Sequence, residues 1–110
     1  MRFLAIGERT PDYTTARAFE LMAAEMDTAR ALYGERVIRE AYMDDSYADA
    51  VLLLDAENLA AATAHVNRYP MVQAGIIHFR ITPLVGLPAI IADTKPQVLP
   101  DWWPAGSDGL

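Results

Sequence analysis

The sequence contains no cysteine, which excludes disulfide bonds, thiolate nucleophiles and cysteine-ligated metal sites. Positive charge is also scarce, because Lys95 is the single lysine and the 110 residues carry a net charge of −6. Binding to nucleic acids and to anionic membrane surfaces depends on clustered lysine and arginine. We therefore expect neither nucleic acid nor membrane as a partner.

Long apolar runs are missing as well. The apolar run at the N-terminus is too short for a signal peptide, and no run approaches the roughly 20 residues that span a bilayer. There is no glycine-rich phosphate-binding loop, and His65 and His78 lie on different predicted elements. We expect a cytoplasmic protein that uses no cofactor and no metal.

Apolar residues, in contrast, are plentiful. They make up 53% of the chain, whereas charged residues make up 22%. A chain of this length forms a single domain with one modest core. The excess of apolar residues indicates that some are buried against another subunit.

Strand-like alternation and helical repeats follow one another in the order βαββαβ. Strands are expected at 2–8, 36–43, 48–54 and 75–82, and helices at 15–33 and 56–68. This order predicts an α+β protein with a ferredoxin-like fold, in which four antiparallel strands carry both helices on one face. The opposite, bare face of the sheet then becomes an interface, a pocket, or both.

The helical repeats also predict which side chains face the sheet. In the first helix an inward stripe is expected at Phe19, Met22, Met26, Ala29 and Tyr33. Gly34 stands where a helix commonly ends in a left-handed residue. The second helix is expected to begin at an Asp55 cap and to end at Pro70.

The composition changes after the last strand. Residues 1–88 are predicted to form the domain, and 89–110 an extended C-terminal arm rich in proline but also in aliphatic residues, Trp102 and Trp103. A segment this apolar is expected to dock on a surface. That surface is either a neighbouring subunit or the arm's own domain.

Several junctions carry a family resemblance. They are the helix end Leu32-Tyr33-Gly34 and the segments 37–42, 50–55, 69–75 and 81–84. In these the sequence resembles the dimeric α+β barrel superfamily, in particular its muconolactone isomerase-like and YCII-related branches. The resemblance implies a homodimer, or an assembly of dimers, whose bare sheet faces pack into a barrel. It also implies a small-molecule substrate, often aromatic or a lactone. The histidine–aspartate pair of YCII-related members is not matched, because no histidine lies near the first helix.

Two residues of the last strand are the first catalytic candidates. His78 and Arg80 are two positions apart, so their side chains point to the same face. Histidine can transfer protons near neutral pH, and arginine can stabilise an oxyanion. The alternative is that both lie at a polar subunit interface, bridged to carboxylates.

Two residues of the second strand are further candidates. Glu40 and Tyr42 share a face and could supply a base and a phenolic donor to a pocket. Alternatively, Glu40 pairs with an arginine across the sheet.

These residues lead to one main function hypothesis and two others. The first is a cofactor-independent isomerase or cyclase that transfers a proton on a hydrophobic lactone, ketone or aromatic substrate. The second is a cofactor-free oxygenase of an aromatic substrate. The third is a non-catalytic binding or assembly module, which predicts a filled barrel without a ligand-sized cavity.

Overall fold

The computed structural model describes residues 1–87 and 100–102. Its elements are, in chain order, β1 (Arg2–Arg9), α1 (Thr15–Gly34), β2 (Ile38–Met43), β3 (Ala50–Asp55), α2 (Leu59–Val66), α3 (Pro70–Gln73) and β4 (Ile77–Leu84). The predicted α+β order is confirmed, with the short α3 as an unpredicted addition. The predicted arm at 89–110 lies outside the described residues except for 100–102.

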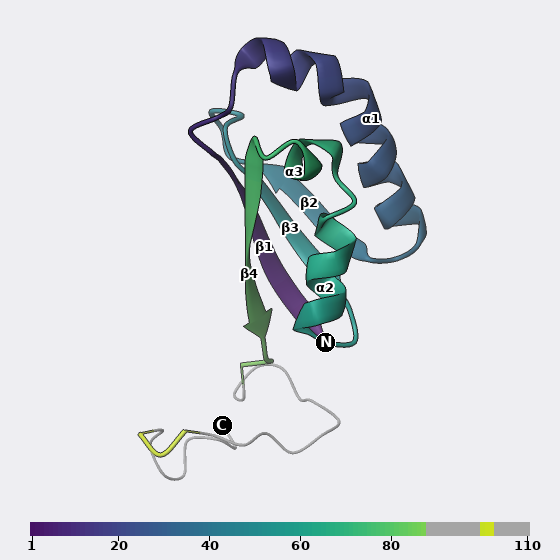
Figure 1. Cartoon of the computed structure of the whole chain (residues 1–110). Coiled ribbons are helices and arrows are strands. Elements are labelled where there is room, and N and C mark those ends of the chain that lie inside the picture. Colours follow the sequence, from purple (N-terminus) through teal and green to yellow (C-terminus); the bar gives the residue numbers. More distant parts are fainter. Residues whose placement is uncertain (88–99, 103–110) are drawn as a thin grey trace.

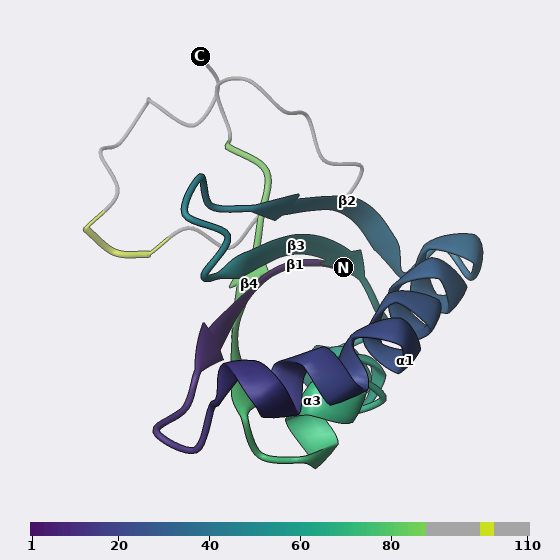
Figure 2. The same cartoon turned by 90° about the horizontal axis from the view of Figure 1, so that it is seen from above.

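The four strands form one antiparallel sheet in the order β2-β3-β1-β4. All three helices lie on the same face of this sheet (Figure 1). Seen from above, the sheet curves, and α1 and α3 lie on its concave side (Figure 2). The ferredoxin-like arrangement expected from the sequence is therefore present. None of the helices in the described residues is long and apolar enough to cross a membrane.

The core lies between the concave face of the sheet and the helices. In β1, Phe3 and Ala5 are fully buried and lie opposite Leu54 and Leu52 of β3. Leu32 of α1 is also fully buried and joins the same cluster. Burial of these apolar side chains is the main force that holds the helices on the sheet.

Helix α1 begins as predicted, but it faces the sheet along a different row. Thr14 caps it by accepting a hydrogen bond from the Arg17 N–H at 3.1 Å. Its buried residues are Ala18, Glu25 and Leu32, which are spaced by seven. Seven residues are almost two full turns, so these three side chains lie on one face of the helix.

The predicted inward stripe of α1 is wrong except at Ala29, which is partly buried and packs against the core. Phe19 is 83% exposed and Tyr33 is 66% exposed. Met22 and Met26 are also exposed, although both line a cavity described below. All of the predicted stripe except Phe19 lines this cavity. The row of Ala18, Glu25 and Leu32 is buried instead, because it packs against α3 and the sheet.

Three helix boundaries also differ from their predictions. Gly34 does not adopt the left-handed conformation. Arg36 adopts it instead, with a φ of 64°. Asn58 rather than Asp55 caps α2, accepting a hydrogen bond from the Ala61 N–H at 2.8 Å. Pro70 begins α3, where a first-turn proline loses no hydrogen bond.

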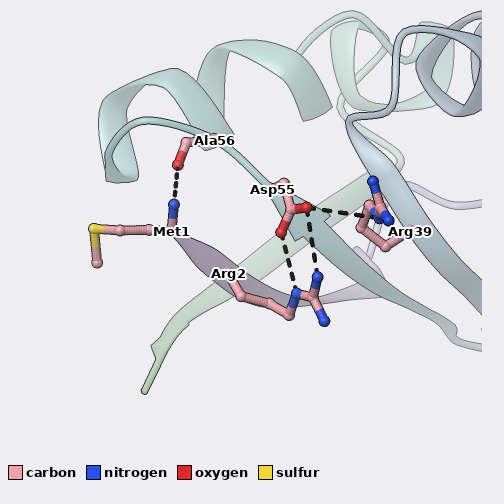
Figure 3. A network of polar contacts seen from close by, with 5 residues as sticks. All are labelled: Met1, Arg2, Arg39, Asp55 and Ala56. Carbon is pink, nitrogen blue, oxygen red and sulfur yellow. Dashed lines mark hydrogen bonds and ion pairs between the residues drawn. The ribbon is translucent and has the colours of Figure 1, made fainter. Parts of the chain in front are cut away.

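Asp55 does not cap the helix because it lies at the end of β3 and forms ion pairs with two arginines. Its carboxylate accepts a hydrogen bond from Arg2 Nε at 3.1 Å and lies 3.6 Å from Arg39 Nε (Figure 3). A bulge between Ile38 and Glu40 interrupts the alternation of β2 at Arg39. These exposed ion pairs connect β1, β2 and β3, and each contributes little to stability.

Gly7 lies opposite Phe79, and the two residues are packed closely. A Cβ atom at Gly7 would lie 3.0 Å from two carbons of the Phe79 ring. We expect Gly7→Ala to lower the free energy of unfolding by about 1–3 kcal/mol, because the ring must move to avoid overpacking. Chemical denaturation of the two proteins measures this difference.

Gly34→Ala is the matched control for this substitution. No atom lies within 4 Å of a Cβ at Gly34, which closes a helix. The free energy of unfolding of the Gly34→Ala protein should stay the same or rise slightly, because alanine favours the helix over the unfolded chain. A Gly7→Ala protein as stable as Gly34→Ala would contradict the close packing.

Candidate functional site

A cavity of about 600 Å³ lies between the concave face of the sheet and α1. This volume is within the range of small-molecule sites, and the walls are largely apolar. The strands contribute its floor, and α1 and the start of α3 contribute its walls.

Small side chains on neighbouring strands leave room for the cavity. Gly7 of β1 lies directly opposite Ala50 of β3, and both line the floor. On the other side Gly7 lies opposite Phe79 of β4, whose ring forms another part of the lining. If Gly7 and Ala50 were larger residues, their side chains would fill this space.

Glu25 is the single charged residue that is buried in the described part of the chain. Its side chain is 8% exposed and lines the cavity from α1. One carboxylate oxygen accepts a hydrogen bond from the backbone N–H of Met71 at 3.0 Å. Burial raises the pKa of the Glu25 carboxyl above its ordinary value, and the Met71 N–H opposes only part of this rise. A carboxyl group in this setting is suited to exchange a proton with a ligand.

Tyr69 lines the same cavity immediately before α3. It is 5% exposed, and its ring stacks on Phe79 with centroids 5.6 Å apart and an interplanar angle of 26°. Burial, helped by the negative charge of Glu25, raises the pKa of the Tyr69 hydroxyl to about 12. This hydroxyl therefore keeps its proton at neutral pH and remains a hydrogen-bond donor.

Positively charged and aromatic residues also line the cavity. The Arg9 guanidinium lies 4.3 Å from the centre of the Tyr13 ring, a cation–π contact. Arg30 forms an ion pair with Asp27 at 3.0 Å. Both arginines are exposed, so water screens their charges more than that of Glu25.

The structure places the predicted catalytic residues of β4 outside this cavity. His78 and Arg80 are exposed and do not line it. Arg80 forms an ion pair with Glu8 of β1 at 3.1 Å, and His78 is the register partner of Glu8. This ion pair agrees with the alternative of a carboxylate-bridged polar surface, while the catalytic role of both residues stays a prediction.

The predicted pair on β2 is partly connected to the cavity. The Tyr42 hydroxyl donates a hydrogen bond to Glu40 at 2.8 Å, so the two side chains share a face as expected. This bond raises the pKa of Tyr42. Tyr42 lines the cavity, whereas Glu40 does not, and both are exposed. Their catalytic role also stays a prediction.

Sequence reasoning missed Glu25 and the role of Tyr69 in the cavity. The available signal was that Glu25 stands seven residues from both Ala18 and Leu32, so that a charge shares a row with apolar residues. Within the described residues there is no cluster of histidine, aspartate and glutamate that could hold a metal ion.

No family model and no curated protein matches the sequence, but solved structures match the fold. Muconolactone isomerase superposes with a TM-score of 0.68 at 21% identity, covering 84% of this chain and 98% of that one. The chain has the fold of muconolactone isomerase. A second match is 5-chloro-2-hydroxyhydroquinone dehydrochlorinase from Burkholderia phenoliruptrix AC1100, in complex with 2,5-dihydroxybenzoquinone. Its TM-score is 0.62 at 18% identity, covering 77% of this chain and 94% of that one. The muconolactone isomerase-like architecture predicted from the sequence is thus confirmed.

The raised pKa of Glu25 leads to a pH-dependent stability. A carboxyl that binds its proton more tightly in the folded state stabilises the fold below its unfolded pKa, ordinarily 4.5. This contribution is lost as the pH rises through the folded pKa. The free energy of unfolding of the unmodified protein, minus that of Glu25→Gln, should therefore fall as the pH rises from about 4.5 and then level off. Denaturation at a series of pH values measures the difference.

Glu20→Gln serves as the control, because Glu20 lies on the same helix with its side chain 63% exposed. The free energy of unfolding of Glu20→Gln, minus that of Glu25→Gln, should fall with pH in the same way as it does for the unmodified protein. A constant difference at every pH would mean that burial does not disfavour the charge on Glu25.

Proposed function

We propose that this protein is a small, cofactor-independent enzyme that transfers a proton on a cyclic, aromatic-derived substrate, with Glu25 as the proton carrier. The observation that carries this proposal is the buried Glu25 carboxyl, with its raised pKa, in the wall of an apolar cavity of about 600 Å³. Isomerisation and dehydrochlorination, the activities named for the two structural matches, both involve proton transfer.

The proposed isomerisation needs no oxidant or reductant. Ionised Glu25 takes a proton from a carbon next to a substrate carbonyl, and the electrons of that C–H bond pass into an enolate. The protonated carboxyl then returns the proton to another carbon, so that a double bond moves and the carboxylate is regenerated. A carboxyl with a raised pKa is suited to both steps, since its acidic and basic forms lie closer in energy near neutral pH.

Deuterium exchange tests this role of Glu25. Muconolactone and related five-membered lactones, incubated with the protein in deuterated water, report carbon-bound exchange by NMR. We expect Glu25→Gln to slow the exchange by roughly 100-fold or more, because general acid–base assistance is lost. The control Glu20→Gln should exchange at the rate of the unmodified protein.

The same assay compares Glu25 with the catalytic candidates of β4. If His78 carries the proton, His78→Ala slows exchange by a similar factor, Arg80→Lys is also slow, and Glu25→Gln is fully active. That outcome would overturn the assignment to Glu25. We expect instead that both β4 variants exchange normally, because neither residue lines the cavity.

We further propose that the bare face of the sheet binds a second copy of this chain. Leu4 and Ile6 of β1 and Val51 and Leu53 of β3 are half-buried and alternate with the core residues, so they face away from the helices. The ion pairs of Asp55 and of Arg80 lie at opposite ends of this strip. An apolar centre with charged residues around it is typical of subunit interfaces.

Sedimentation tests this assembly. At low micromolar concentration we expect the unmodified protein to sediment as a dimer or a larger assembly. Leu53→Arg should give a folded monomer, because a charge would then be buried without a partner. The control Ala60→Arg, at an exposed position on α2, should keep the original mass. An unmodified protein that sediments as a monomer would contradict the proposal.

A further inference from the structure

Two residues that line the cavity each have a polar side-chain atom without a hydrogen-bond partner among the described residues. The hydroxyl of Tyr69 makes no hydrogen bond there, although the residue is 5% exposed. The carboxylate of Glu25 uses Oε1 to bind the Met71 N–H and leaves Oε2 without a partner among these residues. Since buried polar groups in proteins are nearly always hydrogen-bonded, both atoms point to a partner that enters the cavity.

Both groups are held in place by the same short segment. Tyr69 directly precedes Pro70, the first residue of α3, and its ring is stacked on Phe79. The N–H that holds Glu25 belongs to Met71, the second residue of α3. The start of α3 therefore positions a phenolic donor and a carboxylate in the wall of one cavity before any ligand binds.

We propose that the Tyr69 hydroxyl donates a hydrogen bond to a ligand oxygen, and that this oxygen is the one that becomes negative when Glu25 removes the proton. This inference rests on the proposed function and identifies the ligand class as a ring that carries a carbonyl oxygen conjugated with the C–H bond that is broken, so that a phenol or enol resembles the enolate that forms. Tyr69 keeps its own proton throughout; the electrons of the broken C–H bond come to rest on the ligand oxygen, and the proton goes to Glu25.

The surroundings make this donor effective. The high pKa of Tyr69 keeps the hydroxyl protonated over the working pH range of most enzymes. The apolar lining around it lowers the local dielectric constant, which strengthens a hydrogen bond to a developing oxyanion. Arg9 and Arg30, which also line the cavity, are exposed and contact Tyr13 and Asp27 respectively, so their charges are more strongly screened.

Tyr69→Phe tests the proposal, because it removes the hydroxyl and keeps the ring on Phe79. The probes are 4-fluorophenol and fluorobenzene, which differ in one hydroxyl group and are titrated by fluorine NMR. We expect the unmodified protein to bind 4-fluorophenol at least tenfold more tightly than fluorobenzene. In Tyr69→Phe this preference should largely disappear, while the affinity for fluorobenzene stays the same.

Thermal stability distinguishes recognition from a structural role. The melting temperature of Tyr69→Phe should equal or exceed that of the unmodified protein, because a buried hydroxyl without a partner is removed. Thr63→Val is the control: it removes a hydroxyl at an exposed position on α2 that does not line the cavity, and it should leave both affinities unchanged.

Three results would overturn the role of Tyr69. They are equal binding of both probes by the unmodified protein, an unchanged preference in Tyr69→Phe, or a melting temperature several degrees lower in that variant. These results are independent of proton transfer, since neither probe is turned over. A Glu25→Gln protein that still exchanges lactone protons would instead refute the proposed function, so the two failures can be told apart.

Discussion

The hydrogen bond between the Glu25 carboxylate and the Met71 N–H is the interaction on which the site depends. It joins the middle of α1 to the start of α3, 46 residues later in the chain, inside an otherwise apolar interior. A carboxylate is costly to bury, which raises the pKa of Glu25, and the backbone donor offsets only part of this cost. Helix α3 supplies this N–H at its second residue, and Tyr69, which also lines the cavity, lies immediately before the helix.

The cavity itself results from what the sheet lacks. Gly7 and Ala50 face each other across β1 and β3, and large side chains at these two positions would fill the cavity. Phe79 fills part of the space beside Gly7 and supports the ring of Tyr69. The core is therefore divided along the strands, with close packing around Phe3 at one end and an open volume at the other. A ligand site between sheet and helix follows from this gradient in side-chain size.

The fold was predictable from the sequence to a large extent, because its signals are local. Alternation in β1 and β4 and the repeats of α1 and α2 identified every major element within a few residues. The rotation of α1 was not predictable in the same way. The helical spacing of apolar residues placed Phe19 and Tyr33 on an inward stripe, whereas the row containing Glu25 is buried. The side of a helix that faces a sheet depends on the shape of the opposing surface, which local periodicity does not contain.

The sequence by itself determined the order of strands and helices, the antiparallel sheet with one bare face, and the absence of thiol chemistry. It also brought His78 and Arg80 to attention, since histidine and arginine on one strand are visible as a local pattern. Only the tertiary structure decided that Glu25 and Tyr69 belong to one cavity. They are 44 positions apart on different elements, and each becomes chemically distinctive through burial rather than through residue type. Burial and the pKa values it changes are properties of the packed chain, so no reading of neighbouring residues could assign them.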